Sequence, residues 1–174
     1  MRERVCDHVA VLVEDLEQAL GELGTLRELA HPIEEFPGEG TREVYLGNGR
    51  SRLLLLQAIG PGPYRRALEA RGPGLHHLAF QAPEPRRLLA ALPGWLLHPH
   101  SLESRPQTLW ASRPGLPLVE LSAGTCSGEP LLTGLELAVS ASSQAHLDPF
   151  AALGLPVSVG SRTRLSWSDG TWEP

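Results

Sequence analysis

Hydrophobic positions near the start of the chain follow two different periods. Residues 9–13 are a short run of apolar, mostly β-branched side chains, which predicts a strand. Leucines then recur at positions 16, 20 and 23, the spacing of one helical face, so we expect a helix over residues 15–23. Asp15 is placed to cap this helix, because an aspartate side chain accepts a hydrogen bond from the first turn, and Gly24 is placed to end it.

A hairpin is predicted next. Residues 42–46 and 52–58 resemble strands, and Gly47-Asn48-Gly49 lies between them. Glycine and asparagine tolerate the positive φ angles of tight turns, which favours an antiparallel pairing of the two runs. With a further short strand near residues 26–30, the first unit, residues 1–58, contains a strand, a helix and three more strands.

The same order of elements then restarts. Asp7-His8-Val9-Ala10-Val11 aligns with His76-His77-Leu78-Ala79-Phe80, and a helix follows each segment at a similar offset. Repetition of this kind indicates a duplicated unit. The second unit, residues 59–123, has predicted helices over 64–70 and 86–92 and predicted strands over 78–81, 108–111 and 116–121. A weaker third copy, residues 130–174, has predicted strands over 135–139, 157–159 and 163–167 and a helix over 147–153.

Composition and charge narrow the classes of protein. The 174 residues carry a net charge of -5 and no run of like charges, which argues against nucleic acid or an anionic membrane as a partner. The longest apolar run, residues 53–56, is too short to span a bilayer, and no secretory signal follows Met1, so we expect a cytoplasmic protein. Cys6 and Cys126 lack metal-binding or redox spacing and are expected to stay reduced.

Four segments carry a resemblance to a known family. They are Asp7-His8-Val9-Ala10, Gln57-Ala58-Ile59-Gly60-Pro61, Gly74-Leu75-His76-His77-Leu78-Ala79-Phe80 and Leu118-Val119-Glu120-Leu121. In this order and spacing they resemble the vicinal-oxygen-chelate superfamily, and within it the methylmalonyl-CoA epimerases, over about two thirds of the chain. The resemblance implies an α+β fold in which paired βαβββ modules form a curled mixed sheet around a central cavity. The third, partial module would follow at the C-terminus.

The resemblance also implies a divalent metal ion, such as zinc, manganese, cobalt, nickel or iron, held by His8, His77 and Glu120. Neutral imidazole and carboxylate are common ligands of these ions. Because side chains alternate along a strand, His77 would face the metal with His8, and His76 would take the opposite face and contact substrate. The family's fourth ligand position falls on Leu54, which cannot ligate, and nearby Gln57 should face away.

The implied reaction removes a proton next to the carbonyl of a small carbonyl or acyl-CoA substrate, with Glu43 and Glu120 as the catalytic carboxylates. Arg65 and Arg66, with Arg71, could bind the substrate's phosphates, although a solvated helix face is the stronger explanation for them. Leu54 keeps two alternatives open: an iron-dependent ring-cleaving dioxygenase with two histidines and one carboxylate, and a metal-free small-molecule binding protein of the bleomycin-resistance kind. The partial third module favours a homodimer, in which a second chain would complete it.

Overall fold

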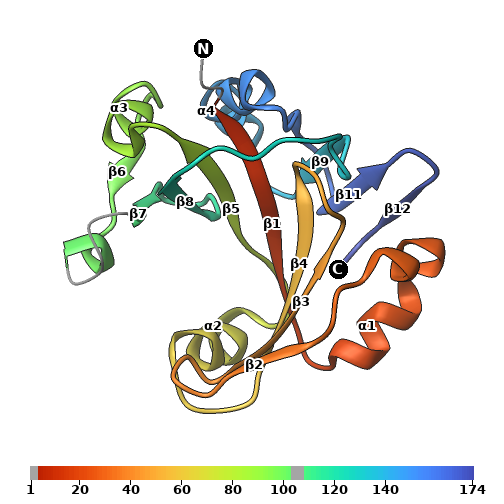
Figure 1. Ribbon diagram of the computed structural model, residues 1–174. Coiled ribbons are helices and arrows are strands. Elements are labelled where there is room, and N and C mark those ends of the chain that lie inside the picture. Colours follow the sequence, from red (N-terminus) through yellow and green to blue (C-terminus); the bar gives the residue numbers. More distant parts are fainter. Residues whose placement is uncertain (1–3, 103–107) are drawn as a thin grey trace.

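The structure is a computed structural model that describes residues 4–102 and 108–174. Within these residues it contains an eight-stranded sheet, in the order β2-β3-β4-β1-β5-β8-β7-β6, and a four-stranded sheet, in the order β10-β9-β11-β12 (Figure 1). The strands are β1 Val5–Val13, β2 Glu34–Phe36, β3 Thr41–Leu46, β4 Arg52–Ala58, β5 Gly74–Ala82, β6 Leu96–Leu97, β7 Thr108–Ser112, β8 Leu118–Ala123, β9 Gly134–Leu137, β10 Val157–Val159, β11 Arg164–Trp167 and β12 Gly170–Trp172. The α-helices are α1 Leu16–Glu22, α2 Pro63–Arg71, α3 Pro85–Ala90 and α4 Gln144–Leu147, and the 3₁₀ helices are η1 Gly24–Leu29, η2 Pro99–Leu102, η3 Ala141–Ser143 and η4 Asp148–Leu153.

The eight-stranded sheet is built from two modules with the same connections. In the first, β1 pairs in parallel with β4, which pairs antiparallel with β3, and β3 with β2. In the second, β5, β8, β7 and β6 repeat this arrangement in the same order. Each module therefore has the βαβββ topology, and the predicted α+β class with paired modules in a mixed sheet is confirmed.

The two modules meet at β1 and β5, which run antiparallel. Val9 pairs with Leu78, His8 with Ala79, and Ala10 with His77. This register is symmetric about the Val9–Leu78 pair, so a local two-fold axis at that point exchanges one module for the other. This axis thus relates the two sequence repeats to one another, and His8 and His77 lie on either side of it.

The two faces of this sheet bury different side chains. Val9 and Val11 of β1 pack into the main core with the leucines of α1 and α3, because alternate residues of a strand point to the same side. On the other face, which we call the inner face, a smaller apolar cluster of Ala10, Leu12, Leu54 and Leu56 is covered by α2. Helix α2 closes this side through Tyr64, Ala67 and Leu68.

The C-terminal residues form the smaller sheet, which differs from the modules in its connections. Strand β9 pairs in parallel with β10, the next strand along the chain, whereas the first strand of each module pairs with the module's last. The ring of Phe150 in η4 stacks on Phe80 of β5, with centroids 4.9 Å apart, and so fastens this unit to the main sheet. The division of the chain at 1–58, 59–123 and 130–174 stays a prediction.

Two local predictions differ from the structure. The segment predicted as a short strand near residues 26–30 is the 3₁₀ helix η1, and the second strand of the module is Glu34–Phe36 instead. All three residues of that strand are exposed, so no alternation of apolar side chains marks it. The helix predicted over 147–153 is mostly the 3₁₀ helix η4, which begins next to Pro149, a residue without a backbone N–H to donate. Among the described residues, every helix falls short of the length and apolar character that crossing a membrane requires.

Candidate metal centre

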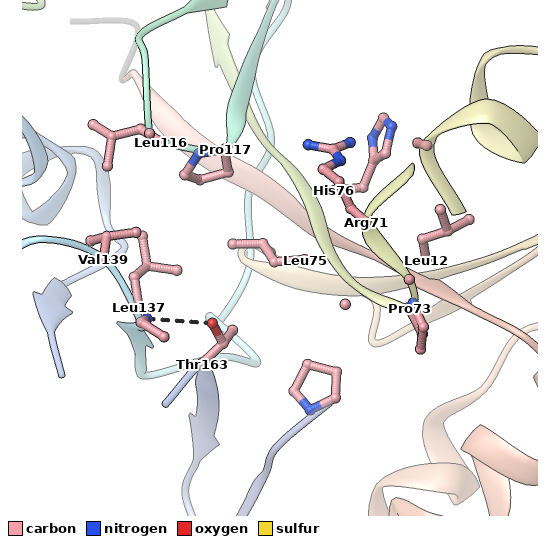
Figure 2. A pocket seen from close by; sticks show the side chains of 16 residues that line it. Leu12, Arg71, Pro73, Leu75, His76, Leu116, Pro117, Leu137, Val139 and Thr163 are labelled. Carbon is pink, nitrogen blue, oxygen red and sulfur yellow. Dashed lines mark hydrogen bonds between the residues drawn. The ribbon is translucent and has the colours of Figure 1, made fainter. Parts of the chain in front are cut away.

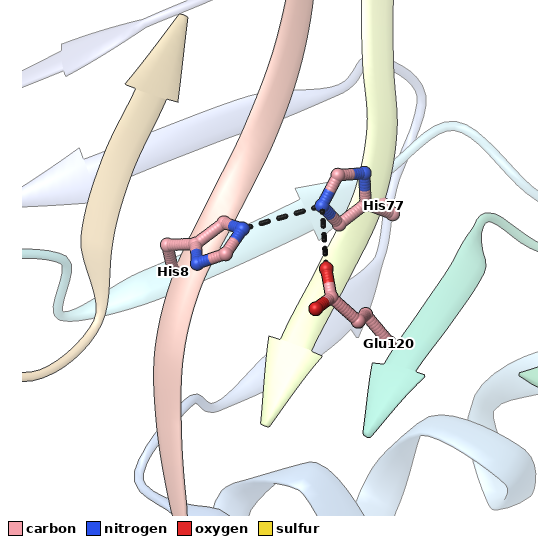
Figure 3. Close-up of side chains that lie close together, drawn as sticks. All are labelled: His8, His77 and Glu120. Atoms are coloured by element: carbon pink, nitrogen blue, oxygen red, sulfur yellow. Dashed lines mark hydrogen bonds and ion pairs between the residues drawn. The ribbon is translucent and has the colours of Figure 1, made fainter. Parts of the chain in front are cut away.

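Three side chains from three strands converge on one point of the inner face (Figure 3). Nε2 of His8 lies 3.2 Å from Nε2 of His77, and Oε2 of Glu120 lies 3.4 Å from the same His77 nitrogen. One ligand atom from each residue lies within 4.8 Å of the other two. The structure therefore brings together the three residues for which the sequence predicts a metal site.

The register of the strands explains this convergence. The local two-fold axis places His8 and His77 opposite one another across the β1–β5 pair. Strand β8 runs beside β5, and Glu120 pairs with Ala79, two residues beyond His77 and on the same face. The carboxylate thus reaches the point where the two imidazoles meet.

The geometry and chemistry of this group fit a divalent cation. Ligand atoms bound about 2.1 Å from one metal ion lie about 3.0 Å apart at a right angle and about 3.4 Å apart at a tetrahedral angle, and the contacts of 3.2 and 3.4 Å fall in this range. The histidines are almost fully buried, and the Glu120 side chain is 22% exposed. With their lone pairs directed at one another and little water nearby, these three groups can be satisfied by a cation between them.

The charge states of the group suit ligation. Burial lowers the pKa of His77, although its contact with Glu120 acts in the opposite direction, so its ring is neutral at pH 7. Burial alone would raise the pKa of Glu120, but the contact with His77 outweighs it, and the pKa lies below its usual value. The group therefore offers a neutral imidazole and an ionised carboxylate to a cation.

His8 is held in place by a carboxylate on its own strand. Its Nδ1 lies 2.6 Å from Oδ2 of Asp7, and Arg52 of β4 donates to both oxygens of that carboxylate, at 2.8 and 2.9 Å. The Arg52 guanidinium also lies over the ring of Tyr45, 4.3 Å from its centroid, and Tyr45 meets His8 edge to face. An Nδ1–H that donates to Asp7 leaves the Nε2 lone pair directed at the metal position.

His77 has the equivalent support from the residue before it. Nδ1 of His76 lies 2.8 Å from Nδ1 of His77, and the His76 ring packs against Tyr64 of α2. Burial lowers the pKa of His76 to about 3, and the neighbouring His77 and Arg71 act in the same direction, so this ring stays neutral. Trp110 of β7 meets His77 edge to face on another side.

Two β-bulges produce both of these contacts. The pairing of β1 with β5 shifts between Cys6 and His8 and again between Ala10 and Val11, where His77 and Leu75 are successive partners. The extra residues are Asp7 and His76, which occupy equivalent positions of the two repeats. A bulge breaks the alternation of side chains, so each extra residue lies beside the histidine that follows it. The prediction that His76 takes the opposite face from His77 is wrong for this reason.

The fourth ligand position predicted by the resemblance is occupied by Leu54. Leu54 pairs with Ala10, two residues after His8, in the same way that Glu120 pairs with Ala79, two residues after His77. The register therefore makes Leu54 the counterpart of Glu120 in the first module. Gln57 faces α1, where its side chain accepts from Arg42, so it lies away from the three ligands as expected.

Glu43 lies on the inner face of β3, two residues before Tyr45 and paired with Leu56 of β4. Its Oε1 accepts a hydrogen bond of 2.7 Å from the Thr41 hydroxyl. Burial raises the pKa of Glu43, and the nearby Glu39 adds to this effect, while the Thr41 hydrogen bond opposes it. A half-buried carboxylate with a raised pKa is suited to accept and return a proton.

The two arginines predicted to bind substrate have different surroundings. Arg65 donates to the backbone oxygen of Ala58 at 2.7 Å, which ties α2 to the end of β4. Arg66 is exposed on the same helix. Their contact with substrate stays a prediction. Sequence reasoning gave no role to Asp7, Arg52 or Trp110, and the one local signal was the acidic residue directly before His8.

Known proteins resemble this chain in structure but not detectably in sequence. No family model matches the chain, and no curated protein matches it. A hypothetical protein from Bacillus halodurans is 18% identical, with a TM-score of 0.58, and the match covers 72% of this chain and 98% of that one. The methylmalonyl-CoA epimerase from Mycobacterium tuberculosis is 20% identical, with a TM-score of 0.53, covering 70% of this chain and 88% of the other.

A third structure is a variant of the Streptomyces coelicolor methylmalonyl-CoA epimerase in complex with 2-nitronate-propionyl-CoA. It is 18% identical, with a TM-score of 0.55, and the match covers 71% of this chain and 99% of that one. At these identities the likeness shows that this chain has the fold of the methylmalonyl-CoA epimerases. Part of the chain lies outside each match.

Proposed function

We propose that this protein is a metal-dependent enzyme that removes a proton from a carbon next to a carbonyl group, as an epimerase, isomerase or lyase does. The observation that carries the proposal is the convergence of His8, His77 and Glu120 on one point of the inner face. The fold shared with methylmalonyl-CoA epimerases supports it. Glu43, on the same face and with a raised pKa, supplies a group that can accept the proton.

The chain's own residues have separate roles in this reaction. His8, His77 and Glu120 would hold the divalent ion, which supplies a positive charge for the oxygen that becomes an enolate. Asp7 and Arg52 fix the ring of His8, and His76 fixes the ring of His77. Glu43 takes the proton at a carboxylate oxygen and can exchange it with solvent, because its side chain is only half-buried. Glu120, as the other carboxylate of the site, would return a proton to the opposite face of the enolate.

We further propose a CoA thioester as the substrate. One structurally similar epimerase is in complex with methylmalonyl-CoA and another with 2-nitronate-propionyl-CoA. Exposed Arg66 and the partly exposed Arg65, both on α2, would meet phosphates at the rim of the site. A cytoplasmic location and assembly as a homodimer complete this proposal.

A second candidate function follows from Leu54. Without a donor at that position, the protein offers two histidines and one carboxylate, the ligand set of iron enzymes that activate oxygen. An iron-dependent, ring-cleaving dioxygenase would use the same three residues. Under this alternative, Glu43 would have no proton to abstract from a carbon next to a carbonyl.

Proton exchange separates the two candidates. Methylmalonyl-CoA in heavy water should gain deuterium at its α-carbon when the metal-loaded protein is added, as followed by mass spectrometry. Glu43→Gln should slow the exchange by a factor of about 10² to 10⁴ and leave the metal content unchanged. Rapid exchange that is unaffected by Glu43→Gln would remove Glu43 from the mechanism. The absence of exchange with any acyl-CoA, together with oxygen uptake on a catechol, would favour the dioxygenase.

A further inference from the structure

A cavity lies between the main sheet and the C-terminal unit (Figure 2). His8, His77 and Glu120 are not among the residues that line it. Its volume is about 550 Å³, within the range of small-molecule sites. One wall is the turn between α2 and β5, another is the turn between β7 and β8, and the C-terminal unit closes the third side through Leu137, Val139 and Thr163. The C-terminal unit thus lines part of this cavity.

Polar and apolar groups both line this cavity, and the apolar side chains gather on one side. Leu75, Leu116, Pro117, Leu137 and Val139 face the space across from Arg71 and His76, which lie together in Figure 2. Thr163 is already engaged, because its hydroxyl accepts from the backbone N–H of Ala138. Arg71 is exposed at the last turn of α2, and His76 is 7% exposed. The cavity therefore has apolar side chains on one side and a guanidinium beside a buried imidazole on the other.

The second ring nitrogen of His76 is available to a ligand. Its Nδ1 is used by His77, and within residues 4–102 and 108–174 no hydrogen bond is made by Nε2. When His77 directs its Nε2 lone pair at a metal ion, its Nδ1 carries the proton and donates to Nδ1 of His76. His76 must then carry its own proton on Nε2. Metal binding at one site would thus set a hydrogen-bond donor at the edge of the other.

We propose that this cavity binds a small organic monocarboxylate, with the carboxylate between Arg71 and His76 and the apolar chain against Leu75, Leu116 and Val139. One guanidinium and one neutral N–H match a singly charged acceptor with two oxygens. A phosphate dianion would carry more negative charge than the one guanidinium balances. The proposal rests on the proposed metal site only for the direction of the hydrogen bond between His77 and His76.

Butyrate is the probe for the test, with binding measured by isothermal titration calorimetry on the full chain loaded with zinc. Arg71→Gln should weaken butyrate binding by about tenfold or more, because a hydrogen bond to a charged group is lost. Leu116→Trp should abolish it by filling the cavity. Arg86→Gln, on exposed α3 and away from the lining, is the matched control and should bind as the wild type does. Equal affinity in all four proteins, or inorganic phosphate binding as tightly as butyrate, would overturn the proposal.

The metal content of the same samples keeps this test separate from the proposed function. If the protein binds zinc, removing it with a chelator should weaken butyrate binding, because the His76 donor is lost, and an unchanged affinity would refute the link through His77. If the protein binds no zinc, the metal-dependent function fails. Butyrate binding that still depends on Arg71 and is blocked by Leu116→Trp would then support the cavity on its own.

Discussion

Asp7→Asn is the substitution that tests how the metal centre is built. The Asp7 carboxylate accepts from Nδ1 of His8 at 2.6 Å and from Arg52 at 2.8 and 2.9 Å, and its side chain is only 10% exposed. An asparagine keeps the shape but loses the charge, so His8 becomes a weaker and less firmly oriented ligand. Loss of such a supporting partner typically costs a factor of about 10 to 100 in metal affinity, or roughly 1.4 to 2.7 kcal/mol.

The assay is a competition for zinc between the protein and a chromophoric chelator at pH 7.5. Thermal unfolding of the metal-free protein, measured in parallel, reports any general loss of stability. Glu17→Gln is the matched control, since it removes the same charge from an ion pair with Arg42 at 2.8 Å on the other face of the sheet. That pair is exposed to solvent and should contribute little to stability and nothing to zinc binding.

The reasoning is refuted if Asp7→Asn binds zinc within about twofold of the wild type. It is also refuted if Glu17→Gln weakens zinc binding as much, since the effect would then come from net charge. A fall in zinc affinity that is confined to Asp7→Asn would show that the bulge residue Asp7 supports metal binding.

Three further predictions concern stability and ligand number. Leu54→Gln places a donor at the symmetric counterpart of Glu120 and should tighten zinc binding about tenfold, whereas Leu56→Gln, in the same apolar cluster, should only destabilise the fold by about 1 to 3 kcal/mol. The pKa of His76 is about 3 in the fold, below the unfolded value of about 6.5. The unfolded state therefore binds more protons between these values, so metal-free protein should lose stability in urea as the pH falls from 7 to 4, and His76→Gln should flatten this dependence. Phe150→Ala should lower the free energy of unfolding, measured by chemical denaturation, by about 3 to 5 kcal/mol. Phe36→Ala, at an exposed site, should lower it by less than about 1 kcal/mol. Equal effects would show that the Phe150 stack does not stabilise the packing of the C-terminal unit.

Most of the duplicated part of the fold could be predicted from the sequence, because local patterns and the repeat agree there. Leucines at helical spacing gave α1, and Asp15 caps it as expected, since its side chain accepts from the backbone N–H of Gln18. The glycine-rich turn gave the β3–β4 hairpin. Strand β2 was misplaced because its exposed residues carry no hydrophobic alternation, and pairing with β3 alone keeps it extended.

The grouping of His8, His77 and Glu120 could be predicted because the family resemblance named these residues and the repeat supported two of them. Their supporting residues could not be predicted, because those contacts depend on strand register and on bulges. Arg52 lies 45 residues from Asp7 along the chain and reaches it only through the parallel pairing of β1 with β4. Alternation alone assigned His76 to the wrong side, since a bulge cannot be recognised from residue types in one sequence.

The connections of the C-terminal unit also lay beyond sequence reasoning. Its elements follow the order of a module, but β9 takes β10 as its parallel neighbour. In each module the parallel neighbour of the first strand is the last strand of that module. Packing against the rest of the fold determines which strands pair. Here the Phe80–Phe150 stack and the cavity beside Leu116 depend on contacts between units that periodicity does not encode.

The central claim is that His8, His77 and Glu120 hold one divalent ion, and elemental analysis tests it most directly. Protein purified without chelator should contain about one zinc, manganese, cobalt, nickel or iron ion per chain. His146→Ala, a histidine change on α4 of the C-terminal unit, should keep this content, and His77→Ala should reduce it to a small fraction. Wild-type protein that binds no stoichiometric divalent ion, even after incubation with each of these metals, would contradict the account.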